Sequence, residues 1–257
     1  MCFKCLPVLL LAGAWTCQSV AAPILYGDLN GTTVDFLGIQ EDSATDLAPL
    51  FGTPSVSGDA LSFNPTSFAA TSALGAPLID NTNGALGFTI QAKTGHVIDT
   101  VKFQEAGDYS LAAALGAANP LADVTVSATF FVSILEVNGT GITPVTFNGN
   151  MIFTPNLNGV FALPAHDTGG ALAIWEGSIT LDVQQALDDA NIQGSATRVL
   201  MTLDNQLQAR SNNEAVAFIQ KKSVGGVAIS VVPEPGTAVL ALAGTLVMLS
   251  ARRRRIA

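Results

Sequence analysis

The chain has 257 residues, of which 49% are apolar, 12% charged and 7% aromatic, and its formal charge is −9. This composition excludes a disordered chain, which needs low hydrophobicity and high charge. The acidic balance lacks the basic footprint of a nucleic-acid binder, and no apolar run is long enough for a protein with several membrane spans. The length is ample for one large all-β domain with a buried core.

The first 22 residues have the three parts of a secretory signal peptide. Lys4 supplies the positive charge of the N-terminal region, Leu6 to Trp15 form a short apolar stretch, and Ser19-Val20-Ala21-Ala22 provides the small residues of a cleavage site. We predict cleavage by signal peptidase after Ala22 or one residue earlier, with a lipoprotein-type cut before Cys17 as the alternative. All three cysteines precede the predicted cut, so the exported protein has no disulfide and no cysteine metal site.

The body, residues 23–230, has the alternating pattern of half-buried antiparallel strands. The alternation is clearest from Val124 to Ile134, where only Phe131 interrupts the polar face. It recurs over Ala173–Val183 and Val199–Gln208. Weaker candidates are 24–29, 33–39, 85–91, 97–104, 142–147, 215–219 and 227–232.

Five Asn-Gly pairs, at positions 30, 83, 138, 148 and 158, favour tight hairpin turns between these strands. Together they predict an all-β fold, an antiparallel β-sandwich of which a jelly roll is one form. One short helix is expected from Asp182 or Val183 to Gln193. Ser110–Ala118 fits either a second helix or an Ala-rich strand. Ser43–Pro77, rich in Ser, Thr, Pro and Gly, is expected to be a long surface excursion.

The body carries no catalytic signature, and we expect no enzyme activity. The only histidines are His96 and His166, no His-Glu-x-x-His motif occurs, and no Ser lies in a Gly-x-Ser-x-Gly elbow. For Trp175, core packing is favoured over a platform for sugar binding. The acids near strands are interpreted as solvated or hydrogen-bonded groups of the polar face; they are Glu105, Asp108, Glu136 and Glu176.

Oxygen-rich loops offer weak candidates for a structural Ca²⁺ ion, which takes six to eight oxygen ligands. One group comprises Asp28, Asn30 and Asp35, and a second cluster runs from Asp80 to Gly84. Neither completes a twelve-residue calcium loop, because no Glu closes it. The alternative is an Asx turn, in which Asp and Asn bond their own backbone. No other cofactor is predicted.

The end of the chain has three parts in a fixed order. Val232-Pro233-Glu234-Pro235-Gly236 is followed by an apolar run over 236–251 and then by Arg252-Arg253-Arg254-Arg255. As a helix the run would span about 24 Å, a little short of a hydrocarbon core, and snorkelling arginines with local thinning cover that deficit. The arginines place their end on the cytoplasmic side. Proline keeps the preceding motif extended.

These parts resemble the PEP-CTERM sorting signal of Gram-negative bacteria, over residues 231–257. The resemblance implies recognition by an exosortase, an integral-membrane cysteine protease or transpeptidase-like enzyme. It implies that the tail is removed and that the body is released or transferred to the cell surface. It also implies an association with exopolysaccharide, biofilm or floc formation, but it assigns no activity to the body.

Without its two terminal segments the body keeps six basic and nineteen acidic residues, a net charge of −13. We therefore predict an exported cell-surface or extracellular-matrix protein, held transiently in the inner membrane with its body periplasmic. Its role would be structural or adhesive and linked to exopolysaccharide, with no nucleic-acid partner. The alternatives are a polysaccharide-binding module or carbohydrate-active enzyme with the same anchor, and an unprocessed single-span membrane protein.

Sorting predicts that the secreted protein lacks its C-terminal arginines. Mass spectrometry of the protein recovered outside the cell should find a chain that starts after Ala22 and ends before Arg252. A secreted chain that retains Arg252 to Arg255 would contradict processing.

Overall fold

The computed structural model describes residues 22–222 and 228–232. Antiparallel strands in two sheets make up most of these residues, which confirms the all-β prediction. The predicted signal peptide before Ala22, the sorting signal after Val232 and the apolar run 236–251 lie outside them. Within the described ranges, no helix is both long and apolar enough to cross a membrane.

The first sheet has seven strands and is centred on three long ones. In spatial order its strands are β1 (Ile24–Asn30), β2 (Val34–Asp42), β6 (Ile79–Ala92), β13 (Ala196–Ser211), β8 (Ala122–Val137) and β11 (Val160–Ala162), with β9 (Thr140–Asn150) also paired to β8. The free side of β8 is shared, because β11 covers its first half and β9 its second.

The second sheet has eight strands and is centred on β7. Its main path is β10 (Ile152–Thr154), β12 (Ala173–Asp182), β7 (Thr100–Ala113), β15 (Ala228–Val232), β4 (Ala60–Ser62) and β3 (Ser55–Ser57), while β14 (Ala215–Lys221) pairs with β7 and with β5 (Ala69–Ala73). β12 pairs with one side of β7 from Thr100 to Tyr109, and β14 and β15 divide the other side between them.

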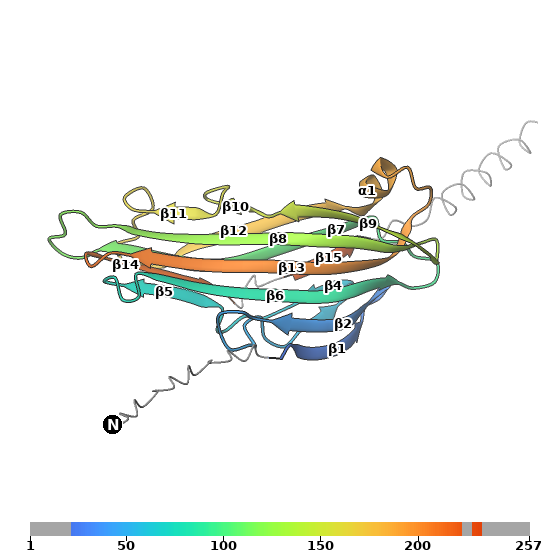
Figure 1. Ribbon diagram of the computed structural model, residues 1–257, viewed down its shortest axis with the longest axis horizontal. Helices are drawn as coiled ribbons and strands as arrows, with labels where there is room; N and C mark the ends of the chain where they lie inside the picture. Colours follow the sequence, from blue (N-terminus) through green and yellow to red (C-terminus); the bar gives the residue numbers. More distant parts are fainter. Residues whose placement is uncertain (1–21, 223–227, 233–257) are drawn as a thin grey trace, which may run out of the picture.

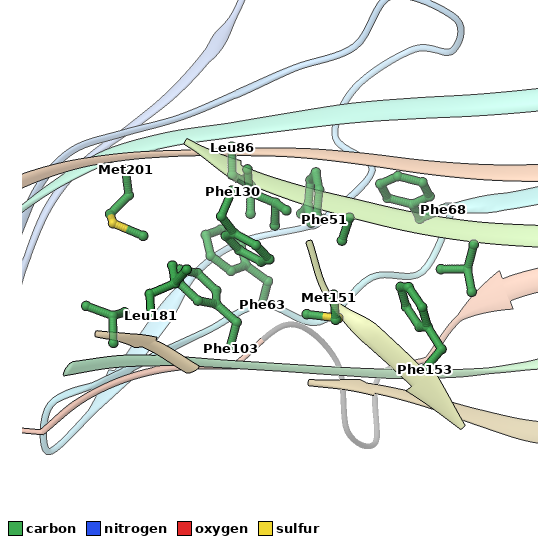
Figure 2. Packing of buried hydrophobic residues seen from close by; sticks show 14 of the residues in the cluster. Phe51, Phe63, Phe68, Leu86, Phe103, Phe130, Met151, Phe153, Leu181 and Met201 are labelled. Atoms are coloured by element: carbon green, nitrogen blue, oxygen red, sulfur yellow. The ribbon is translucent and has the colours of Figure 1, made fainter. Parts of the chain in front are cut away.

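The two sheets pack face to face, with their long strands along the longest axis of the molecule (Figure 1). Their inner faces form one core in which rings from both sheets meet (Figure 2). Phe103 of β7 and Phe130 of β8 lie with ring centroids 4.0 Å apart. Phe131, the exception in the sequence pattern, points outward and is 49% exposed. The alternation of apolar and polar residues in β8 therefore predicts correctly which side chains face the core and which face solvent.

The segment Ser43–Pro77 differs from its prediction as a surface excursion. It forms β3, β4 and β5, and Phe51 and Phe68 within it are completely buried. Glu41, also buried, anchors the start of the segment by accepting hydrogen bonds from the amides of Leu50 and Phe51 and from the Tyr26 hydroxyl. Burial, together with the hydrogen bond to Glu41 and its negative charge, raises the pKa of Tyr26.

The Asn-Gly pairs have two different roles. At the β8–β9 hairpin, Asn138 and Gly139 have φ values of 51° and 75°, as a tight turn of this kind requires. Asn83-Gly84 and Asn148-Gly149 instead lie inside β6 and β9. A Cβ atom on Gly84 would lie 2.7 Å from the Phe68 ring, so this glycine makes room for the core.

The predicted helix exists but is shorter than expected. α1 spans Val183–Asp189, and the carboxylate of Asp182 caps it by accepting a hydrogen bond from the Gln185 amide at 2.8 Å. The prediction of a helix or a strand from Ser110 resolves as the end of β7, through Ala113.

Adjacent phenylalanines offer a direct test of the sandwich. Phe130→Ala should lower the free energy of unfolding by about 3–5 kcal/mol, because it leaves a cavity between the sheets. Phe131→Ala should change it by no more than about 0.5 kcal/mol, because that ring points to solvent. Urea denaturation of both variants measures the difference, and equal losses would contradict the assigned faces.

Candidate functional site

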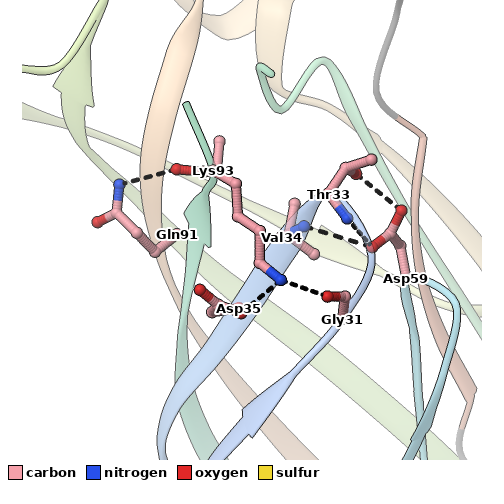
Figure 3. A network of polar contacts seen from close by, with 8 residues as sticks. Gly31, Thr33, Val34, Asp35, Asp59, Gln91 and Lys93 are labelled. Atoms are coloured by element: carbon pink, nitrogen blue, oxygen red, sulfur yellow. Dashed lines mark hydrogen bonds and ion pairs between the residues drawn. The ribbon is translucent and has the colours of Figure 1, made fainter. Parts of the chain in front are cut away.

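The first group of calcium candidates, Asp28, Asn30 and Asp35, lies around the β1–β2 hairpin, and Asp35 already has a charged partner there (Figure 3). The second cluster, from Asp80 to Gly84, lies within β6. Asp35 Oδ1 is 3.2 Å from Lys93 Nζ, which also donates to the Gly31 carbonyl at 2.5 Å. Asp28 Oδ1 accepts a hydrogen bond from the Gly38 amide at 2.7 Å. Across the described part of the chain, no three His, Cys, Asp or Glu side chains gather as metal ligands would. A lysine cation neutralises Asp35 here.

Asp59 fastens the same hairpin to the second sheet's β3–β4 turn (Figure 3). Its carboxylate accepts from the Thr33 amide and hydroxyl, each at 2.7 Å, and from the Val34 amide at 3.3 Å. Partial burial acts to raise the pKa of Asp59, but these hydrogen bonds outweigh it, and the pKa lies below its ordinary value. The carboxylate thus serves as a structural clasp between the sheets.

Three of the four strand acids named from the sequence form ion pairs. Glu136 lies 3.3 Å from Arg198, Asp108 lies 2.7 Å from Lys222, and Glu105 lies 2.6 Å from Lys221. Glu176 is exposed and lines a hollow of about 340 Å³ on the second sheet, with Gln104, Thr154 and Ser178 among its neighbours.

The histidine and tryptophan candidates have packing roles in the structure. His166 Nδ1 accepts a hydrogen bond from the Ala162 amide at 3.3 Å, and its ring meets the Phe161 ring edge-on. Trp175 has no exposed surface, which confirms core packing over an exposed sugar platform.

A larger cleft, of about 650 Å³, opens between β9, β12 and α1. It exists because strand pairing stops early at this corner of the sandwich. β10 pairs with β12 only from Glu176 to Ser178, so the following residues of β12 stand at the edge of the described sheet. β9 in turn pairs only with β8 among the described strands. Two sheet edges therefore face each other across an open space, with α1 at one end.

The lining of this cleft divides into an apolar floor and a polar rim. Val145, Phe147 and Ile179 are half-buried at the floor, with Leu181 fully buried beside them. The absent side chain of Gly149 admits Ile179, whose Cδ1 would lie only 2.7 Å from a Cβ at that position. The rim is built from hydroxyl, amide and carboxylate groups; its members are Thr146, Asn148, Asn150, Thr180, Gln185 and Asp189. Such a lining suits a ligand with both apolar and hydrogen-bonding surface.

A polar cluster lies in the core between the sheets. It corrects the interpretation of Glu105 as a group of the polar face, and it includes Asn205 and Lys221, which the sequence analysis did not name. Lys221 Nζ and Asn205 Nδ2 each lie 2.6 Å from Glu105 Oε2. All three residues are at most 2% exposed. The signal was present in the sequence, because each of these polar residues falls in phase with the inward apolar positions of its strand.

Comparison with known proteins gives little guidance. No known family model matches the chain, and no curated protein matches it. One solved structure, TmCBM61 in complex with β-1,4-galactotriose, aligns with a TM-score of 0.20 and 9% identity over 72% of this chain and 90% of that one. The enzymatically active domain of bacteriophage CBA120 tailspike protein 4 aligns with a TM-score of 0.17 and 10% identity, over 83% of this chain and 20% of that one. Scores this low establish neither a shared fold nor a shared ligand.

Removing the charge of Asp59 tests the clasp. Asp59→Asn should lower the free energy of unfolding at pH 7 by about 1 kcal/mol, because the amide accepts fewer hydrogen bonds and carries no charge. A carboxylate whose pKa is lowered by folding stabilises the fold at pH values above the ordinary pKa of Asp. The difference in stability between the variant and wild type should therefore shrink as the pH falls below about 4. Urea denaturation of the variant and of wild type at several pH values measures this difference in the free energy of unfolding.

The control is Asp46→Asn, an exposed aspartate with a hydrogen bond from the neighbouring Thr45 hydroxyl. It should leave stability nearly unchanged at every pH. Equal behaviour of the two variants would rule out the clasp.

Proposed function

We propose that this protein is an exported cell-surface or matrix protein whose body contacts neutral polysaccharide in the cleft between β9, β12 and α1. The observation that carries the proposal is the lining of that cleft. A sugar ring presents apolar C–H groups on its faces and hydroxyls around its edge, and the floor and rim match these two surfaces. The volume of about 650 Å³ falls within the range of about 300–1,000 Å³ for ligand sites.

The charge of the body favours a neutral ligand over an acidic one. Asp182 and Asp189 lie on the cleft, while Lys and Arg are absent from its lining residues. A uronic acid or sulfated sugar placed there would meet like charges, which oppose binding. The role is accordingly structural or adhesive within an exopolysaccharide matrix, without chemistry on the sugar.

The proposal includes export and sorting. Signal peptidase would cut after Ala22, the apolar run 236–251 would form a transient inner-membrane helix, and an exosortase would act at the Pro-Glu-Pro motif. The position of β15 supports this order of segments, because that strand ends at Val232, the first residue of the motif. The motif would then follow the folded body directly.

We also assign the sandwich to the jelly-roll form. The support is the order of strands, since neighbours in space are often distant in sequence. β13 lies between β6 and β8 in the first sheet, and β15 pairs with β7 in the second. Such crossovers between two antiparallel sheets are typical of Greek-key and jelly-roll topologies.

A variant that fills the cleft tests polysaccharide binding. Gln185 is exposed on the cleft side of α1, so Gln185→Trp should place an indole in the space and weaken binding about tenfold or more, or about 1.4 kcal/mol. Binding would be measured by affinity electrophoresis in gels that contain soluble neutral glucan, galactan or mannan, with alginate as the acidic comparison.

The matched control is Asp188→Trp, which adds the same ring to an exposed position of α1 outside the cleft lining. It should bind as wild type does. Wild-type protein that is retarded by none of the neutral polysaccharides, or retardation lost equally in both variants, would overturn the proposal.

A further inference from the structure

Three polar side chains from three strands meet in the middle of the core. Glu105 comes from β7, Lys221 from β14 and Asn205 from β13, so both sheets contribute. One carboxylate oxygen, Glu105 Oε2, is 2.6 Å from the lysine nitrogen and 2.6 Å from the amide nitrogen of Asn205. The amine and the amide are therefore no farther apart than the sum of these two distances.

Some polar atoms of this cluster lack the hydrogen bonds that a purely structural buried ion pair needs. Among the described residues, neither Glu105 Oε1 nor Asn205 Oδ1 has a hydrogen-bond partner, and both atoms are buried. Buried ion pairs stabilise a fold only when further hydrogen bonds satisfy their remaining polar atoms. Aromatic rings surround the amine instead, with the Trp175 centroid 5.0 Å and the Phe68 centroid 5.3 Å from Lys221 Nζ.

The surrounding sequence leaves space for the three groups. In the strand register, Asn205 stands between Gly84 of β6 and Ala128 of β8. Lys221 stands opposite Gly107, where a Cβ atom would lie 2.6 Å from the Trp175 ring. Small residues thus flank the polar groups and allow Trp175 to pack against them.

The surroundings of Lys221 act on the charge of its amine in two directions. Burial lowers the pKa of Lys221, while the charge of Glu105 and its hydrogen bond act in the opposite direction. Transfer of the proton from Lys221 to Glu105 leaves two neutral groups, which a low-dielectric interior accommodates better than separated ions. The amine then has a free electron pair, and the protonated carboxyl becomes a hydrogen-bond donor.

We propose that Lys221 and Asn205 join through an intramolecular isopeptide bond, with Glu105 as the group that transfers protons. The lysine Nζ attacks Asn205 Cγ while the carboxyl of Glu105 donates a hydrogen bond to the amide oxygen, which a half-turn of the Asn205 amide brings into place. The Nζ–Cγ bond forms and the Cγ–Nδ2 bond breaks. Glu105 relays the lysine proton to the departing nitrogen, which leaves as ammonia.

The reaction balances without an oxidant, a metal or a cofactor. A primary amine and a primary amide become a secondary amide and ammonia. The product joins β13 of the first sheet to β14 of the second by a covalent bond. It removes the buried charges and provides a cross-link in a body whose predicted mature form has no cysteine.

Intact-mass spectrometry of the full chain, purified in its folded form, tests the proposal directly. The protein should be lighter, by one molecule of ammonia, than the mass calculated from the sequence between its observed first and last residues. Proteolysis and tandem mass spectrometry should then find a branched peptide that links a fragment with Lys221 to a fragment with Asn205. Folded protein at the full sequence mass would overturn the proposal, as would loss of ammonia without a branched peptide, which a succinimide at Asn205 would give.

Variants separate the roles of the three residues. Lys221→Met and Asn205→Ala should each abolish the branched peptide, and Glu105→Gln should abolish it while both reacting side chains remain. The control is Lys222→Met, which removes the next lysine along the chain and should keep the cross-link. A folded Glu105→Gln variant that still forms the bond would overturn the role of Glu105. The wild-type mass decides the main question even where a variant fails to fold.

Discussion

The contact between the inner faces of β7 and β8 is the constraint on which the rest of this structure depends. β7 lies inside the second sheet and β8 inside the first, and Phe103 and Phe130 meet between them. Other strands extend each sheet outward, and their inward side chains complete the same core. The body's own apolar surface therefore provides most of the driving force for folding, as burial does in proteins generally.

Both candidate sites arise where this arrangement is interrupted. The cleft opens beyond Ile152, where β10 begins and leaves the rest of β12 at a sheet edge, so core-facing residues such as Phe147 and Ile179 remain half-exposed. The polar cluster forms where Asn205 and Lys221 occupy positions that alternation would give to apolar residues. One interruption exposes apolar surface and the other buries polar groups, and these are the departures that most often accompany function.

The sequence predicted the strands well where alternation was regular, as in β8, and it placed the hairpin at Asn138-Gly139 correctly. It failed over Ser43–Pro77, because Phe51 and Phe68 are spaced irregularly among Ser, Pro and Gly. The amide of Phe51 is also held by Glu41, which lies outside the segment. The cleft was not predictable, since it depends on how far β10 extends along β12. Asn205 and Lys221 could have been noticed as polar residues in phase with apolar ones, but their meeting at Glu105 depends on the topology.

The position of β15 determines how the body would bear a pull from its C-terminal side. This strand lies inside the second sheet, bonded to β7 on one side and to β4 on the other. Tension applied beyond Val232 would first reach Val231 and Val232, which pair with β7 alone, and then the three preceding residues, which pair with both β7 and β4. An edge strand has one neighbour along its whole length, whereas the first three residues of β15 are held by two.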